Sequence, residues 1–338
     1  MKRAFWPCLA AGLVGWLVLP TAAQEQLASA PANRAAATVN GQAIPEVAVL
    51  RALRRVPPAK HAEARVEILN FLIDNALIDQ YLVQARVPAE PQEVQERLNQ
   101  IKKEIQGENQ SFEKILQELQ LTESELRTQI AADIRWDKFA AQRATDAALR
   151  ELFDKNRDMF DGTLVHARHI LMKAAANDPQ ANEQAKAQLL LVRKQIEDQV
   201  TQGLAKLPPN TDNLTRETER IKLIDAAFSA LARDKSTCPS KEQGGDVGMF
   251  PRAGTMVEPF AQAAFSLKPF QVSDVVTTQF GHHLILVVER RPGKAVKYED
   301  VQEEVKQVFY ERLRDALTKH LRAKSKDAIV IHPVPAQP

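Results

Sequence analysis

The chain of 338 residues has little cysteine, little net charge and only one long apolar run. Two cysteines are too few for a fold held together by disulfides. A formal net charge of +2 excludes a nucleic-acid binder that works by neutralising phosphates, because such a protein needs a basic excess. The single apolar run, together with a negative mean hydropathy, excludes a membrane protein of several spans.

The one apolar run lies near the amino terminus. Lys2 and Arg3 precede an apolar stretch over residues 5–19, which small residues follow. This order is typical of a secretory signal peptide, and the run is shorter than the ~20 residues that span a bilayer. We therefore expect residues 1–23 to be removed on export, which leaves no formal net charge, no stable membrane span and one cysteine, Cys238. An uncleaved membrane anchor is the alternative.

The region after the signal is predicted to be mostly helical. Residues 24–36 are rich in Ala, Pro, Gln and Ser, which predicts a flexible leader. In residues 37–160, an Asn-Gly pair at residues 40–41 predicts a small hairpin. Apolar residues then recur at spacings of three and four, which predicts helices, and Thr122 with Glu125 predicts a capping box at the start of one of them.

The period changes after residue 161. Residues 165–172 and the continuous apolar run 284–288 predict strands, the second of them central in its sheet. Between them, residues 182–202 predict a long helix, and the charged run 216–222 leads into a shorter one. Strands mixed with helices predict a compact α+β domain over residues 163–291.

The carboxy-terminal residues 296–331 contain a further amphipathic helix and a short strand at Ile329. A helix that follows a complete domain has to bury its apolar face elsewhere. We expect it to pack on the amino-terminal helices, and the Ile329 strand to pair with the hairpin that contains Val39.

The residues able to carry chemistry gather in the α+β region: His166, His169, Cys238, His282 and His283. Side chains that are adjacent or three apart on a strand point to opposite faces, so neither histidine pair can bind one ion together. One histidine of each pair with Cys238 would still supply three zinc ligands. A second alternative is hydrolysis with Cys238 as nucleophile, although no local protease signature surrounds it.

Four segments in fixed order resemble the parvulin family of peptidyl-prolyl cis-trans isomerases: His169–Met172, Gln243–Phe250, Met256–Leu267 and Thr278–Ile285. The flanking helical regions resemble the exported SurA-type and PrsA-type foldases. The resemblance implies a small antiparallel sheet with flanking helices, plus an α-helical chaperone-like domain built from both chain ends. It implies isomerisation of X-Pro bonds, with neither a cofactor nor a metal.

The resemblance also implies the roles of particular residues. His169 and His283 match a pair whose rings face each other at the floor of the site. Cys238 matches the place of a catalytic Cys or Asp, between the histidines, where its pKa would be lowered. Thr278 matches a residue whose hydroxyl supports the histidine pair.

The substrate pocket follows from the same resemblance. Val247, Met256 and Phe260 match the pocket that receives the proline ring. Phe250 and Phe265 match positions that either line this pocket or belong to the core. Ordinary core packing is the alternative for Met256 and Phe260 as well.

The chain departs from the family pattern at several points. Residues 198–222 form an insertion, Phe270 stands where glycine is common, and His282 stands where an aromatic residue is usual. Residues 174–176 are alanines, so no arginine cluster is available for a phosphoserine-proline preference. We expect the partners to be unfolded or extended proline-containing polypeptides outside the cytoplasm, in the periplasm or another extracytoplasmic place. A peptide-binding holdase with an inactive parvulin domain is the alternative.

Overall fold

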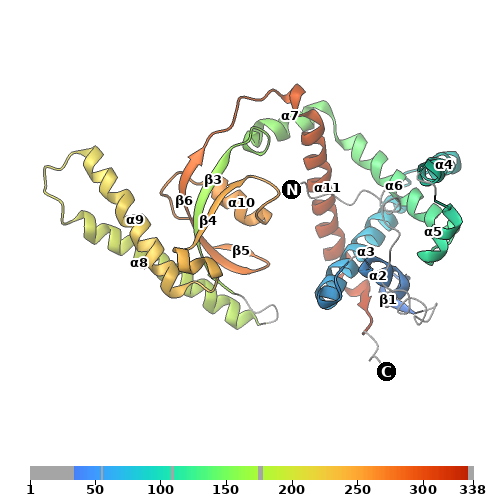
Figure 1. Cartoon of the computed structure of the whole chain (residues 1–338), viewed down its shortest axis with the longest axis horizontal. Coiled ribbons are helices and arrows are strands. Elements are labelled where there is room, and N and C mark those ends of the chain that lie inside the picture. Colours follow the sequence, from blue (N-terminus) through green and yellow to red (C-terminus); the bar gives the residue numbers. More distant parts are fainter. Residues whose placement is uncertain (1–33, 55, 108–109, 174–177, 334–338) are drawn as a thin grey trace. The chain divides into compact units, whose positions relative to one another are not determined.

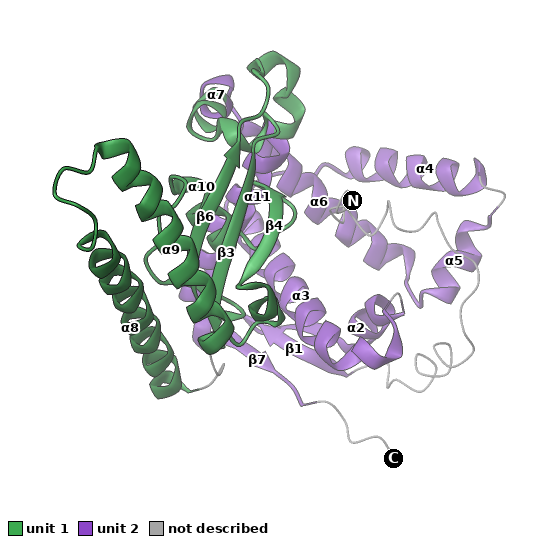
Figure 2. Ribbon diagram, turned by 60° about the vertical axis from the view of Figure 1, so that its left-hand side comes forward, with its two compact units in different colours: residues 1–3, 150–304 green, residues 4–149, 305–338 purple. Residues whose placement is uncertain are grey.

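The computed structural model describes residues 34–54, 56–107, 110–173 and 178–333. The predicted signal peptide lies outside these residues, as does most of the predicted leader. Within them, no helix has both the length and the apolarity needed to cross a membrane. The chain divides into two compact units, one of residues 150–304 and one that joins the residues up to 149 to those from 305 onward (Figure 2).

The unit that joins residues 34–149 to residues 305–333 is mainly helical. Its elements in chain order are β1 (Ala35–Val39), β2 (Gln42–Pro45), α2 (Glu46–Leu53), α3 (His61–Gln84), α4 (Pro91–Gly107), α5 (Phe112–Glu118), α6 (Glu123–Arg143), most of α11 (Gln302–Lys324) and β7 (Ile329–Ile331). Its antiparallel sheet has the order β2-β1-β7, and Figure 2 shows β7 beside β1. Ile329 lies opposite Val39, so strands from the first and the last described parts of the chain share one sheet.

Strand β1 begins earlier than the sequence predicts, because Ala35 and Ala36 belong to it rather than to a flexible leader. Ala36 is 1% exposed, and its carbonyl accepts a hydrogen bond from the amide of His332 (2.9 Å). The predicted hairpin is confirmed: Asn40 and Gly41 have φ angles of 49° and 81°, which suit a tight turn.

Helix α3 is the centre of this unit. Its buried residues Leu69, Ile73 and Leu77 share one core with Phe139 of α6 and Leu321 of α11. The guanidinium of Arg322 in α11 also donates to the carbonyl oxygen of Asn70 in α3 (3.0 Å). Helix α11 therefore packs on the amino-terminal helices through both apolar and polar contacts.

The predicted capping box is confirmed at the start of α6. The hydroxyl of Thr122 accepts from the amide of Glu125 (3.1 Å), and the amide of Thr122 donates to the Glu125 carboxylate (2.8 Å). Two amides that the first turn leaves unpaired are thus satisfied within the helix start.

The other unit contains the larger sheet. Its elements are β3 (Leu164–Met172), α8 (Pro179–Leu204), α9 (Asn213–Lys235), β4 (Asp246–Pro251), α10 (Glu258–Ser266), β5 (Val276–Thr278) and β6 (Gly281–Arg291), and α7 (Asp146–Lys155) leads into it. The antiparallel order is β4-β3-β6-β5, so the apolar strand β6 is central, as predicted (Figure 1). The predicted α+β class is confirmed.

The two faces of β6 bury different helices. Leu284 and Leu286 pack with α8 and α9, whereas Ile285 and Val287 pack with α10. Figure 1 shows α8 and α9 on one side of the sheet and α10 on the other. Successive side chains of a strand point to opposite faces, so the continuous apolar run of β6 packs against the helices on both sides of the sheet.

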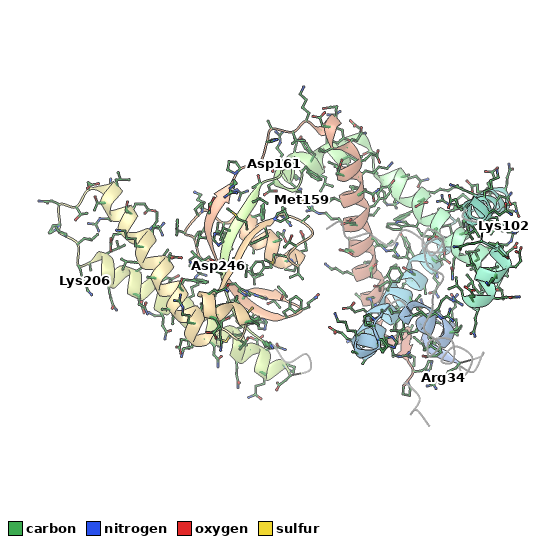
Figure 3. All side chains as sticks on the ribbon, viewed as in Figure 1. Arg34, Lys102, Met159, Asp161, Lys206 and Asp246 are labelled. Carbon is green, nitrogen blue, oxygen red and sulfur yellow. The ribbon has the colours of Figure 1, made fainter. Side chains whose placement is uncertain are left out.

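Helices α8 and α9 form a long antiparallel hairpin. The charged run 216–222 lies inside α9, so the prediction of a short helix after this run was wrong. Asp212 begins the helix upstream of the run, because its carboxylate accepts from the amide of Thr215 (3.0 Å). The connection between the helices contains Lys206 (Figure 3), and the predicted insertion 198–222 makes up the distal part of the hairpin.

Phe270 has a φ of 58°, a conformation that favours glycine. Its amide donates to the carbonyl oxygen of Val287 (2.6 Å), and its side chain packs on the core beneath α8 and α9. The hydrogen bond and the core packing therefore hold Phe270 in a left-handed turn conformation that glycine adopts more easily. This is the turn whose geometry the sequence comparison with the family had put in question.

Candidate active site

Two histidines far apart in sequence meet on the face of the sheet that α10 covers. His169 of β3 lies opposite Ile285, and His283 of β6 lies opposite Leu171, so the two are diagonal neighbours on one face. Their ring centroids are 5.3 Å apart and their Nδ1 atoms 3.1 Å apart. The side chains are nearly buried, with His169 6% and His283 4% exposed.

Hydroxyl groups extend the histidine pair at both ends. The Thr278 hydroxyl lies 2.8 Å from His283 Nε2, and the Ser240 hydroxyl lies 3.1 Å from His169 Nε2. A neutral imidazole has one N–H and one acceptor nitrogen, so the row Thr278, His283, His169, Ser240 can carry its hydrogen bonds in either direction. We name these four residues the polar row.

Burial keeps both rings neutral. It lowers the pKa of His169 from 6.5 to about 4. Burial also lowers the pKa of His283 to about 4, assisted by the neighbouring His169 and His282. Protonation of both rings would set two N–H donors against each other at the Nδ1 contact, so at least one of the two histidines has to be neutral for the polar row to form.

An aromatic ring borders the polar row. The ring of Phe260 meets His169 and His283 edge to face, with centroid distances of 5.6 and 5.4 Å. Phe250 and Phe265 lie behind it and are 0% and 5% exposed, and together with Phe260, which is 3% exposed, they belong to the buried core on this face of the sheet. Val247 and Met256 are half-buried and pack on the same core.

The loop before β4 carries Cys238 and Ser240. It is held to β3 where the amide of Thr237 donates to the carbonyl of Leu171 (2.8 Å) and the amide of Leu171 donates to the hydroxyl of Ser236 (3.0 Å). Cys238 is half-buried just before the 3-10 turn Pro239–Gln243. Its thiol does not lie between the histidines, because their Nδ1 atoms bond each other directly.

Ser240 was not singled out from the sequence. It lies in a short 3-10 turn, where neither the helix period nor the strand period marks an inward residue. The turn-forming run from Ser236 to Ser240, followed by two glycines, is the signal that could have indicated a side chain aimed at the site. Gly245 ends this turn and accepts from the amide of His169 (2.8 Å).

The other two histidines of the region lie apart from the polar row. His166 Nε2 contacts a carboxylate oxygen of Asp246 (2.8 Å), which stands at the start of β4 (Figure 3). His282 Nδ1 contacts the hydroxyl of Thr277 (3.0 Å). Across the ranges that the structure describes, no group of three or more His, Cys, Asp or Glu side chains is arranged to hold a metal ion.

The comparisons with known proteins agree with the resemblance. Residues 209–289 match the family described as the PPIC-type PPIASE domain, and residues 6–140 match the SurA-like N-terminal domain. Peptidyl-prolyl cis-trans isomerase NIMA-interacting 1 of Theileria annulata is 31% identical over 130 residues, which cover 38% of this chain and 83% of that protein. The chain belongs to the parvulin family of peptidyl-prolyl cis-trans isomerases. The family predicted from its motifs is thereby confirmed.

Other relatives are foldases and chaperones by name. Foldase protein PrsA of Bacillus subtilis is 42% identical over 106 residues, and chaperone SurA of Albidiferax ferrireducens is 32% identical over 155 residues. The matches cover 31% and 46% of this chain, and the chain spans only 35% and 32% of those proteins. A crystal structure of PrsA from Bacillus anthracis aligns over 79% of this chain and 100% of that chain, at 20% identity and a TM-score of 0.42.

The close approach at Gly245 predicts a cost for any side chain there. A Cβ at Gly245 would lie 2.3 Å from the carbonyl oxygen of His169, whereas one at Gly254 would meet nothing within 4 Å. Both glycines have positive φ, so alanine costs about 1–2 kcal/mol in strain at either position. We expect Gly245→Ala to lower the free energy of unfolding by about 2 kcal/mol more than Gly254→Ala, measured by chemical denaturation. Equal losses would contradict the packing of Gly245 on β3.

The pKa values of the histidine pair predict how stability depends on pH. Between pH 6.5 and about 4 the unfolded chain binds protons at His169 and His283 that the folded chain does not. The free energy of unfolding should therefore fall as the pH is lowered through this window. Thermal unfolding midpoints should fall less in the double variant His169→Gln, His283→Gln than in the wild type. Parallel curves for the two proteins would show that the histidines are not held neutral.

Proposed function

We propose that this protein is a peptidyl-prolyl cis-trans isomerase that acts on X-Pro bonds of unfolded or extended exported polypeptides, without a covalent intermediate. The observation that carries the proposal is the polar row bordered by Phe260, in which neutral hydrogen-bonding groups adjoin an aromatic ring. His169, Thr278 and His283, with Ser240 added, would form the floor. Val247, Met256 and Phe260 would receive the proline ring.

The energetic demand suits such a site. Rotation about the peptide bond has a barrier of ~18–20 kcal/mol because resonance is lost, and uncatalysed exchange takes ~10–100 s. Exchange within milliseconds requires a rate about ten-thousandfold higher, which corresponds to a lowering of the barrier by roughly 5.5 kcal/mol. No bond breaks, so a site that binds the twisted amide better than the planar one is sufficient.

The polar row can follow a rotating carbonyl. Because its hydrogen bonds can run in either direction, the hydroxyls of Thr278 and Ser240 can each be turned to donate or to accept. The row therefore offers a donor to the carbonyl oxygen, or an acceptor to an amide, without moving a charge into a buried place.

The same geometry does not favour the hydrolytic alternative. Hydrolysis with Cys238 as nucleophile needs a histidine that removes the thiol proton, but a pKa of about 4 makes His169 a weak base. The second nitrogen of His169 bonds to a neutral imidazole, where a hydrolase commonly has an orienting carboxylate.

For the rest of the chain we propose the division expected from the sequence. Residues 1–23 would be an export signal, and the residues between it and β1 a leader. A chaperone-like module would run from β1 to residue 160 and include residues 296–331, and residues 163–291 would form the catalytic domain. The match to the SurA-like N-terminal domain supports the module, and the basic start followed by a short apolar run supports export. Exposed apolar side chains on α3 favour client holding as a second function: Val66, Phe71 and Val83.

A proline-peptide isomerisation assay on the full chain tests the proposal. We expect the wild type to accelerate cis-trans exchange well beyond the uncatalysed rate, and His283→Gln to lose most of that acceleration because it disrupts the polar row. A wild-type rate equal to buffer, with suppression of aggregation of an unfolded client, would leave only the holdase. Thermal unfolding of the variant separates loss of chemistry from loss of fold.

Cys238 tests whether negative charge assists the reaction. A negative group near the carbonyl oxygen opposes amide resonance, so Cys238→Asp should retain more activity than Cys238→Ala, by about tenfold in kcat/KM. Cys238→Ser is the matched control, because it is polar and similar in size but neutral. If the aspartate and alanine variants lose the same activity, charge at this position plays no part.

A further inference from the structure

His282 is a buried histidine that the proposed mechanism does not use. It is 2% exposed and lies beside His283 on β6, on the face that packs against α8 and α9. In the strand register it stands between Met172 of β3 and Thr277 of β5. Its ring therefore adjoins the strand that carries Thr278, from the side opposite the polar row.

The geometry points to His282 as a positioning residue of the active site, which holds β5 through Thr277 so that the hydroxyl of Thr278 stays on His283. The inference rests on the proposed function for its effect on rate. His282 stands at a position where this chain departs from the family pattern. The inference follows from two contacts, one on each face of the short strand β5.

The two contacts form a matched pair. On the α8 and α9 face, Thr277 Oγ1 lies 3.0 Å from His282 Nδ1. On the active-site face, Thr278 Oγ1 lies 2.8 Å from His283 Nε2. Consecutive residues of β5 thus bond consecutive residues of β6, one pair on each face of the sheet.

Strand β5 needs such restraint. It has three residues, Val276–Thr278, lies at the edge of the sheet and pairs with β6 alone in the described part of the chain. A slip of one residue moves every side chain of a strand to the other face. Because Thr277 and Thr278 are identical, the threonines themselves do not specify which of them reaches the polar row.

The contacts on either side of β5 do not fix which threonine faces the polar row. The segment before β5 is held at Ser273, whose amide donates to the carbonyl of Ile285 (2.8 Å) and whose hydroxyl accepts from the amide of Ile285 (2.9 Å). The turn after β5 is held where the amide of Phe280 donates to the Thr278 hydroxyl itself (3.1 Å). Thr278 itself donates to the carbonyl oxygen of Gly281 only at 3.5 Å, the long limit of a hydrogen bond. Between Ser273 and Phe280, the contact of Thr277 with His282 is therefore the short side-chain contact beside Thr278 that joins β5 to β6.

The state of the His282 ring suits a fixed donor. Burial and then the charge of Lys186 lower its pKa, against the opposing effect of Glu183, so the ring is neutral at pH 7. In the described structure Nε2 is buried without a hydrogen-bond partner. Since a buried unpaired N–H is rarer than an unpaired acceptor, we assign the proton to Nδ1, which donates to Thr277.

Four full-length variants test the inference: Thr277→Val, Thr277→Ser, His282→Phe and the double variant Thr277→Val, His282→Phe. Thr277→Val and His282→Phe each break the same bond, so each should lower kcat/KM about fivefold to tenfold, and the double variant should be no worse than either. Thr277→Ser keeps the hydroxyl and should stay within about twofold of the wild type. Thr277 is exposed, so its variants leave the core intact if His282→Phe fails to fold.

A spectroscopic measurement separates this inference from the proposed function. The imidazole ¹⁵N shifts of His283, assigned with His283→Gln, report the bond that Thr278 makes to Nε2. They should move in Thr277→Val but not in Thr277→Ser, even if the wild type shows no isomerase activity. If the His283 ¹⁵N shifts of Thr277→Val equal those of the wild type, the inference is overturned. It is also overturned if Thr277→Ser changes these shifts or lowers kcat/KM as much as Thr277→Val does. In an active protein, a double variant whose loss is the product of the single losses also overturns it.

Discussion

The antiparallel pairing of β3 with β6 is the contact on which the site depends. It runs from Leu164 opposite Arg291 to Met172 opposite His282, and both strands are buried over most of this length. The register places His169 and His283 diagonally on one face. A slip of one residue would turn one of the histidines toward α8 and α9, so the packing of the apolar residues on both faces also maintains the histidine pair.

The same pairing explains why a long hairpin is tolerated between β3 and β4. Helices α8 and α9 leave the sheet after Met172 and return at Ser236, where Ser236 and Thr237 bond both the amide and the carbonyl of Leu171. The ends of the α8–α9 hairpin are therefore joined at one residue of β3, two positions from His169. The entropy of closing a loop grows slowly with its length, so the length of the hairpin costs the site little once these ends are held.

The sequence predicted those features that are determined by residues close together in the chain. The Asn-Gly hairpin, the capping box at Thr122 and the central strand β6 all follow from spacing within a few residues. The beginning of α9 was missed because its first residues, 213–218, are all exposed, which leaves no apolar period to read. The meeting of His169 and His283 was predictable only from the family resemblance, since residues 114 positions apart carry no local signal. Ser240 and the pairing of Thr277 with His282 depend on a turn and a register, and both required the structure.

The neutrality of the histidine pair connects this architecture to the proposed reaction. Two rings buried against Phe260 have no charged partner in the polar row, and burial holds their pKa values near 4. Such groups are poor bases for hydrolysis, which needs a proton removed at neutral pH. Rotation of an amide needs no proton transfer, only hydrogen bonds that suit the twisted form better than the planar one. A row whose polarity can reverse between two hydroxyls supplies those bonds without the cost of burying a charge, which is why a site with weak bases is consistent with an isomerase.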